Sequence, residues 1–242
     1  PRFGLDYKVN DDVLLYVSAS KGVKPGGVST ISGGAAGIDE AANRYASEKL
    51  WVYEGGMKST LMDGTVQFNV AGYYQDFSDK QTSTQLLLPN GSLGTRIINA
   101  SSARVYGVDL ETGIAVNDNL TISAGYTWLD AKYNSFKTTN SSLGTITNAA
   151  NCVPLTGTLT PFTGPATATN RASTCEVDRT GNKLEDSPTH SLQFSPSWSA
   201  PLSGDIGYFV EASFQYTSKR FDTEDNNFFF RGYWNTDMRL GL

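Results

Sequence analysis

The stretch HSLQFSPSWSA, residues 190–200, alternates between two chemistries. Its even positions hold Leu192, Phe194, Pro196 and Trp198, and serines and a glutamine occupy the odd positions from Ser191 onward. Because successive side chains of a β-strand point to opposite faces, the stretch predicts a strand with one apolar and one polar face. A soluble sheet alternates in the same way when its apolar face packs on a core. The rest of the chain has to show whether that face meets protein or lipid.

Composition narrows the class of protein. The 242 residues carry 19 basic and 24 acidic side chains, a net charge of −5, which argues against nucleic acid as a partner. Mean hydropathy is −0.31, but a membrane β-barrel makes half of each strand polar and gives a similarly low average. No apolar run approaches the roughly 20 residues of a spanning helix, which excludes an inner-membrane helical protein. The chain opens with Pro-Arg-Phe, so we expect a piece of a longer protein.

Nine segments alternate in this way and predict an all-β, antiparallel sheet. They cover residues 3–9, 13–20, 49–61, 66–75, 106–116, 120–128, 190–200, 208–217 and 233–242. The connections between them are alternately short and long. Short ones carry turn sequences such as Asn10-Asp11-Asp12 and Asp63-Gly64, whereas the long ones are expected at 21–48, 79–102, 136–186 and 222–230. Short turns at one end and long loops at the other are typical of outer-membrane barrels.

Aromatic residues support the membrane interpretation. Six rings fall near the long-loop ends of the segments: Trp51, Tyr53, Tyr74, Tyr126, Trp128 and Tyr216. Tyr7 and Tyr208 lie near the short-turn ends, so rings gather at both margins of the apolar band, as interfacial girdles require. We therefore expect Leu192, Phe194 and Trp198 to face lipid and the serines to face a wet lumen. Pro196 lacks an N–H for the ladder, so we expect a bulge or bend there.

Four stretches resemble the barrel of a TonB-dependent outer-membrane receptor. They are LYVSASKGVKPGG (15–27), ASEKLWVYEGGMKSTLMDGTVQFNVAGYYQDFSDKQ (46–81), ARVYGVDLETGIAVNDNLTISAGYTWLDAKY (103–133) and GNKLEDSPTHSLQFSPSW (181–198). The resemblance implies a barrel of about 22 strands whose lumen is filled by a plug domain. It also implies a monomer in the bacterial outer membrane, with extracellular long loops, that imports a small-molecule nutrient such as a ferric siderophore or cobalamin. Energy would come from the TonB complex of the inner membrane.

The sequence departs from that pattern by omission. Neither a plug nor an N-terminal TonB box nor a terminal strand ending in an aromatic residue is present. Nine strands are also an odd number, whereas single-chain bacterial barrels have an even one. We therefore expect residues 1–242 to be an internal segment of one barrel domain, because two unpaired strand edges could not persist in lipid.

Two cysteines lie in the longest predicted loop. Cys152 and Cys175 would be paired as a disulfide in the oxidising periplasm, stabilising the fold by roughly 3 kcal/mol in the loop-entropy view. Free or metal-binding thiols are the alternative. We expect no cofactor and no metal centre.

Other candidate chemistry is weak. His190, the one histidine, stands beside Ser191 without a nucleophile-elbow motif, so a structural role at the rim is expected and no catalytic residue is assigned. The Gly-rich residues 26–37 lack a Gly-Lys-Ser/Thr ending and are read as a loop. Residues 222–226 are acidic but match no calcium loop.

Two sets of residues face the predicted lumen and its mouth. Glu54, Lys58, Asp109 and Glu111 are expected to form charge networks that brace the wall or contact a plug. Substrate contacts would come from the long loops, with Arg44, Tyr45, Arg96, Phe136, Arg171, Arg220 and Phe228–Phe230 as candidates, although loop packing is the simpler role for each. The substrate itself cannot be named from loop composition.

Three functions stay open at this point. Energy-coupled import leads, a passive porin or channel is the alternative, and an outer-membrane enzyme or adhesin anchored by the barrel is the third. A porin predicts conductance without energy, and an enzyme predicts an assembled nucleophile and base, which the sequence does not offer.

Overall fold

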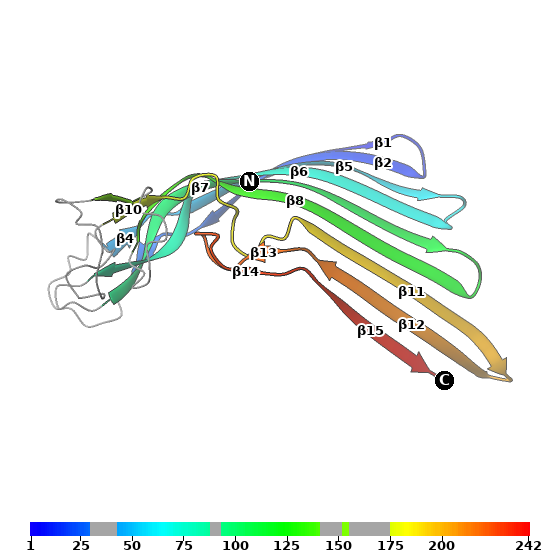
Figure 1. The fold of residues 1–242 in the computed structure, drawn as a ribbon. Coiled ribbons are helices and arrows are strands. Elements are labelled where there is room, and N and C mark those ends of the chain that lie inside the picture. Colours follow the sequence, from blue (N-terminus) through cyan, green and yellow to red (C-terminus); the bar gives the residue numbers. More distant parts are fainter. Residues whose placement is uncertain (30–42, 88–92, 141–151, 155–174) are drawn as a thin grey trace.

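The computed structural model describes residues 1–29, 43–87, 93–140, 152–154 and 175–242. Nine long strands follow one another across a single antiparallel sheet, each paired with its neighbours in sequence order (Figure 1). They are β1 (Arg2–Lys8), β2 (Val13–Lys24), β5 (Glu48–Leu61), β6 (Val66–Leu87), β7 (Leu93–Ala115), β8 (Leu120–Asn140), β11 (His190–Ser203), β12 (Ile206–Thr217) and β15 (Tyr233–Gly241). The predicted nine-segment antiparallel sheet is confirmed. No helix in the described part of the chain is long and apolar enough to cross a membrane.

Shorter strands lie at the long-connection end. β3 (Gly27–Val28) pairs with β4 (Arg44–Tyr45), and β13 (Arg220–Phe221) pairs with β14 (Phe229–Phe230). β10 (Cys175–Asp178) pairs with the end of β8 and with β9 (Cys152–Pro154). Figure 1 shows the tight turns together at one end of the sheet and the long connections at the other, as the sequence predicts.

Local chemistry explains the tight turns. Met62 and Asp63 have φ of 53° and Gly64 has φ of 90°, so this turn uses left-handed conformations that glycine adopts without strain. The Asn117 side chain accepts hydrogen bonds from the backbone N–H groups of Asn119 and Leu120, both at 2.9 Å. These side-chain contacts fix the register of the hairpins at the short-turn end.

Strands extend into two of the predicted loops. β6 and β7 continue as one hairpin to Leu87 and Leu93, so the loop expected at 79–102 is wrong for most of its length. β8 likewise extends to Asn140, inside the loop expected at 136–186. Register shifts near Lys80 and between Ser102 and Ala103 interrupt the alternation that marks the lower strands. The two-residue period is therefore lost while the hydrogen-bonded ladder continues.

Pro196 causes no bulge, and that expectation is wrong. β11 pairs Phe194 with Phe214 and resumes at Ser197 with Glu211 in the same register, and the ladder to β8 runs through Pro196 without a shift. The irregularity of β11 lies instead between Pro201 and Ser203, next to the tight turn.

The buried core is small and lies near the long connections. It consists of Ala103, Val105, Ala131, Tyr133, Phe136 and Leu184, with Tyr73, Phe77 and Leu129 packed against it. Leu184 belongs to the segment that returns from β10 to β11 and bonds to β8 through its N–H and the Ala131 carbonyl at 3.1 Å. Elsewhere the strands form a single layer, so their apolar face has no protein core to cover it.

Candidate functional site

The two faces of the sheet differ consistently from strand to strand. One cross-strand row of paired residues is apolar and aromatic: Tyr7, Leu15, Met57, Val70, Leu110, Tyr126, Leu192, Tyr216 and Trp234. Many side chains on this face are exposed, including Leu5 at 70%, because only a single layer is present. An uncovered apolar band of this size needs lipid, and we call this face the outer wall.

Aromatic rings line the upper margin of the outer wall. Trp51 stacks on Tyr53 at 6.0 Å between ring centroids, Tyr53 on Tyr74 at 6.3 Å, and Tyr74 contacts Tyr106 at 4.9 Å. We call these four rings the aromatic girdle. At the opposite margin Trp198 Nε1 donates a hydrogen bond to Tyr208 Oη at 3.2 Å. Indole and phenol groups with one apolar and one polar end are suited to membrane interfaces.

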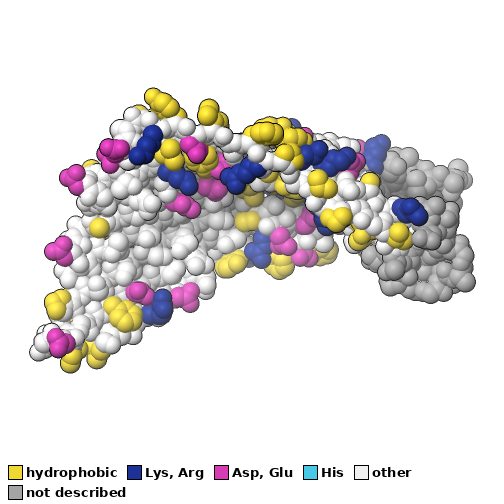
Figure 2. All heavy atoms as spheres, turned by 180° about the vertical axis from the view of Figure 1, so that it is seen from behind, with side chains coloured by type: hydrophobic (Ala, Val, Ile, Leu, Met, Phe, Trp, Pro, Cys, Tyr) yellow, Lys and Arg dark blue, Asp and Glu magenta, His cyan; other side chains and the backbone are white. Residues whose placement is uncertain are grey.

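The opposite face, which we call the polar wall, carries the residues expected to face a lumen. Figure 2 views this side, where polar surface with scattered acidic and basic side chains predominates and hydrophobic groups gather mainly toward the margins. Tyr16 Oη donates to Glu54 Oε1 at 2.7 Å, and the Lys58 ammonium lies 5.7 Å from the centre of the Tyr16 ring. Glu54 and Lys58 are thus joined through Tyr16, a partner that the sequence analysis missed.

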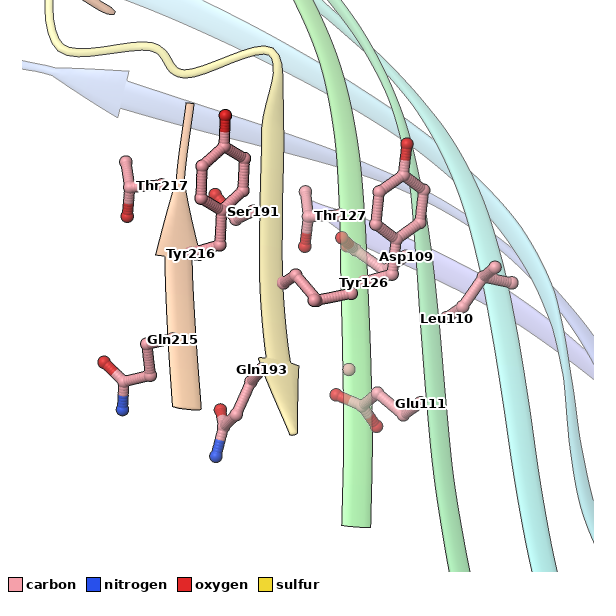
Figure 3. Close-up of a pocket in the computed structure, with 12 residues that line it drawn as sticks. Asp109, Leu110, Glu111, Tyr126, Thr127, Ser191, Gln193, Gln215, Tyr216 and Thr217 are labelled. Atoms are coloured by element: carbon pink, nitrogen blue, oxygen red, sulfur yellow. The ribbon is translucent and has the colours of Figure 1, made fainter. Parts of the chain in front are cut away.

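Asp109 and Glu111 behave differently from that pair. Neither forms an ion pair with any described residue, and both line a hollow of about 290 Å³ on the polar wall (Figure 3). Gln193 of β11 and Gln215 of β12 also line the hollow and lie directly opposite each other. A second hollow of about 280 Å³ shares Glu111 and Gln193 with the first and adds Asn69. Carboxylates and amides open to the lumen can accept and donate hydrogen bonds to whatever fills it.

A compact polar cluster holds the segment between β10 and β11 to the top of the polar wall. Tyr133 Oη donates to Glu185 Oε2 at 2.7 Å, and Lys80 Nζ lies 3.4 Å from Glu185 Oε1. Burial raises the pKa of Glu185, but the Tyr133 hydrogen bond and the Lys80 charge outweigh it, so the pKa lies below its usual value. No two-residue pattern marks this cluster, and sequence reasoning missed it.

The acidic residues 222–226 are held by neighbouring segments. Asp225 accepts hydrogen bonds from Thr223 and Asn227 and lies 3.8 Å from an Arg179 nitrogen. Asn226 exchanges hydrogen bonds with the Lys183 backbone at 2.8 and 2.9 Å. Within the described ranges no cluster of three or more His, Cys, Asp or Glu side chains could hold a metal ion. Burial lowers the pKa of the Arg179 guanidinium.

The candidate substrate residues fall into different environments. Phe136 is fully buried and its ring contacts that of Tyr133 at 4.7 Å between centroids, so it packs in the core. Arg220 pairs with Asp186 at 3.1 Å, and its guanidinium lies 4.8 Å from the Phe230 ring. Phe228, Phe229 and Phe230 are exposed, whereas Arg171 lies outside the described residues. Three more lie on strands at the loop end of the sheet: Arg44, Tyr45 and Arg96.

His190 and the cysteines can also be placed. His190 Nδ1 lies 2.9 Å from Tyr126 Oη on the outer wall, whereas Ser191 points to the polar wall, so the two side chains cannot act together. Cys152 and Cys175 lie on paired strands, opposite Val177 and Pro154 respectively. Their side chains lie outside what the structure describes, and the disulfide stays a prediction. Most of the Gly-rich stretch, from residue 30 to 37, is outside it too.

Known proteins share this architecture. The family model "TonB dependent receptor-like, beta-barrel" matches residues 1–242. The ferric yersiniabactin uptake receptor FyuA of Yersinia pestis superposes with a TM-score of 0.66 at 18% identity, covering 99% of this chain and 29% of FyuA. The siderophore receptor PiuA of Acinetobacter baumannii gives a TM-score of 0.61 at 17% identity, covering 98% of this chain and 28% of PiuA.

A curated relative matches part of the sequence. The metal-pseudopaline receptor CntO of Pseudomonas aeruginosa is 29% identical over 132 residues, which is 54% of this chain and 16% of CntO. The chain therefore spans less than a third of the length of these relatives. With a family match over its whole length and an outer and a polar wall in the sheet, the chain belongs to the TonB-dependent receptor-like β-barrel family.

Proposed function

We propose that this chain forms part of the barrel wall of a receptor that imports a scarce, small-molecule nutrient with energy from the inner-membrane TonB complex. Members of this family are outer-membrane transport receptors, so the chain lies in the bacterial outer membrane with its long connections extracellular. The observation that carries the proposal is the family match over residues 1–242. Two of the receptors that resemble the chain are named for ferric yersiniabactin and metal-pseudopaline. A metal chelate of this kind is the proposed class of cargo, with cobalamin as a further candidate.

The polar wall supports this role. Asp109 and Glu111 present carboxylates that have no ion-pair partner among the described residues, and Gln193 and Gln215 present amides, toward the space that the sheet would enclose. In a receptor of this type that space holds a plug domain, and these groups would supply hydrogen bonds to it. A passive channel remains the alternative function because a water-filled pore also needs a polar wall.

We also propose that residues 1–242 are an internal segment of one larger, monomeric barrel domain. β1 and β15 each pair on one side only within the described residues, and unpaired strand edges are costly in lipid. FyuA, of which the chain covers 29%, offers enough additional length to close such a barrel.

Uptake assays separate the two functions. The native gene product is expressed in a strain that lacks it, and uptake of radiolabelled ferric siderophores and cobalamin is measured with and without a protonophore. Energy-coupled import predicts saturable uptake that the protonophore abolishes. Uptake that persists without energy, together with conductance of the purified protein in a planar bilayer, would instead establish a porin.

A further inference from the structure

Three basic residues lie side by side above the aromatic girdle. Arg104 of β7 is directly opposite Lys132 of β8. On its other side Lys132 is paired with Lys183 through an isolated antiparallel β-bridge of the backbone. Directly paired residues point to the same side of a sheet, so the three cations share the face that carries Tyr106. We call Arg104, Lys132 and Lys183 the basic row. The same cross-strand row continues through Asp76, Trp51 and Lys21.

The girdle fixes the height of the basic row in the membrane. Arg104 stands two residues beyond Tyr106 on the same strand and face, and its guanidinium lies 5.7 Å from the centre of the Tyr106 ring. Girdle rings lie at the level of the lipid headgroups. The basic row therefore meets the headgroups of the outer leaflet, on the side of the long connections.

The charges of the basic row are only partly neutralised. Lys132 Nζ pairs with Asp130 at 3.0 Å, and Lys183 Nζ donates to the uncharged Thr189 hydroxyl at 2.7 Å. Arg104 is exposed and has no ion pair within the described part of the chain. Arg104 and Lys132 are like charges directly opposite each other, which is destabilising. The carboxylates of Asp76, opposite Arg104 on its other side, and of Asp130 offset only part of the three positive charges, so the remaining positive charge favours a bound anion.

We propose that the basic row binds a phosphate group of a phosphorylated glycolipid in the outer leaflet. The planar guanidinium of Arg104 can hold two phosphate oxygens, and the Lys132 ammonium adds a point charge beside it. Below the row, Val108 and Trp128 are paired on the outer wall, where they would contact the acyl chains of the same lipid. Charge above and apolar surface below match a lipid better than a free ion. This lipid site is separate from the polar wall and does not depend on the transported cargo.

Binding of lipid A to the full-length protein in detergent tests the proposal. Fluorescent lipid A carrying its phosphates is compared with the dephosphorylated form, for the wild type and for the Arg104→Gln/Lys132→Gln double variant. The control is Lys24→Gln, which also removes one positive charge near this end of the sheet. Val23 lies on the outer wall with Leu15, so the next residue, Lys24, lies on the polar wall. We expect the wild type to prefer the phosphorylated form, the double variant to bind it on the order of tenfold more weakly, and the control to match the wild type.

Three outcomes would overturn the assignment. The wild type could bind the two lipid forms with equal affinity, or Lys24→Gln could lose as much affinity for lipid A as the double variant does. Inorganic phosphate could also displace the lipid at a concentration similar to that of the lipid. The last would identify a free-anion site. Heat-dependent mobility on gels reports whether each variant is folded. If the double variant does not fold, the single variant Arg104→Gln is tested by the same criteria.

Discussion

The ring of Tyr73 lies over the backbone of Gly107 on the neighbouring strand, where a Cβ atom would overlap the ring. Gly107→Ala should therefore displace Tyr73, which packs against the core, and cost about 1–3 kcal/mol of unfolding free energy. Urea unfolding of the full-length protein in detergent measures this cost.

Gly72→Ala is the matched control, because a Cβ atom at Gly72 would meet no atom within 4 Å. Its effect should stay within about 0.5 kcal/mol. Equal destabilisation by both substitutions would mean that glycine itself, rather than the close approach of Tyr73, is what the sheet requires.

Glu185 gives the cluster at the top of the polar wall a dependence on pH. Its pKa in the folded protein lies below the usual 4.5, so its charged form stabilises the fold at neutral pH, and that contribution is lost as the pH falls below 4.5. Glu185→Gln should cost about 1–3 kcal/mol at neutral pH through the lost charged hydrogen bond. Urea unfolding at about pH 7 and about pH 3 should show the difference between variant and wild type shrinking in acid. A difference that is the same at both pH values would exclude the carboxylate charge as its source.

Site residues could be predicted only where the two-residue period holds. Glu54, Lys58, Asp109 and Glu111 fall on the polar side of regular strands, and the structure places them on one face. Tyr16 of segment 13–20 follows the same parity, but alternation alone does not reveal its hydrogen bond to Glu54. The link between Tyr133, Lys80 and Glu185 joins residues far apart in sequence, and Glu185 lies outside regular strands, so local pattern could not reveal it.

At the scale of one strand, the two walls predict opposite tolerance to charge. Phe194 and Gln193 are neighbours on β11, the first on the outer wall and the second on the polar wall. Phe194→Arg should destabilise the folded barrel by about 2–4 kcal/mol because the guanidinium would enter the hydrocarbon. Gln193→Arg should cost less than about 0.5 kcal/mol.

Urea titration of the protein folded into phosphatidylcholine vesicles compares the two arginine variants under identical conditions. Similar costs at both positions would contradict the assignment of lipid to the outer wall.

Strand identity was predictable and strand length was not. In β6 the alternation from Val66 to Gln75 arises because one face of the strand meets lipid and the other is polar. Beyond Lys80 the hairpin continues with serine, threonine and glutamine, and a strand outside the lipid has no reason to alternate apolar with polar side chains. The alternation in the sequence therefore predicts the membrane-embedded part of the hairpin and does not predict how far its strands continue.

At the scale of the whole molecule, the two one-sided edges make the size of the native polypeptide informative. A barrel of about 22 strands with a plug requires a chain of roughly 70–100 kDa. Mass spectrometry of the protein purified from outer membranes should give a value in this range. A native product near the 26.1 kDa of residues 1–242 would instead mean a small self-contained barrel, and the proposed receptor would be wrong.

The long β6–β7 hairpin has a consequence for how the protein meets its surroundings. A strand of 22 residues is about 75 Å long, whereas about 9–11 residues cross a bilayer. About half of each strand therefore extends beyond the membrane. Substitutions in the upper parts of β6 and β7 therefore need not disturb the lower parts of the same strands, which have to fit the lipid.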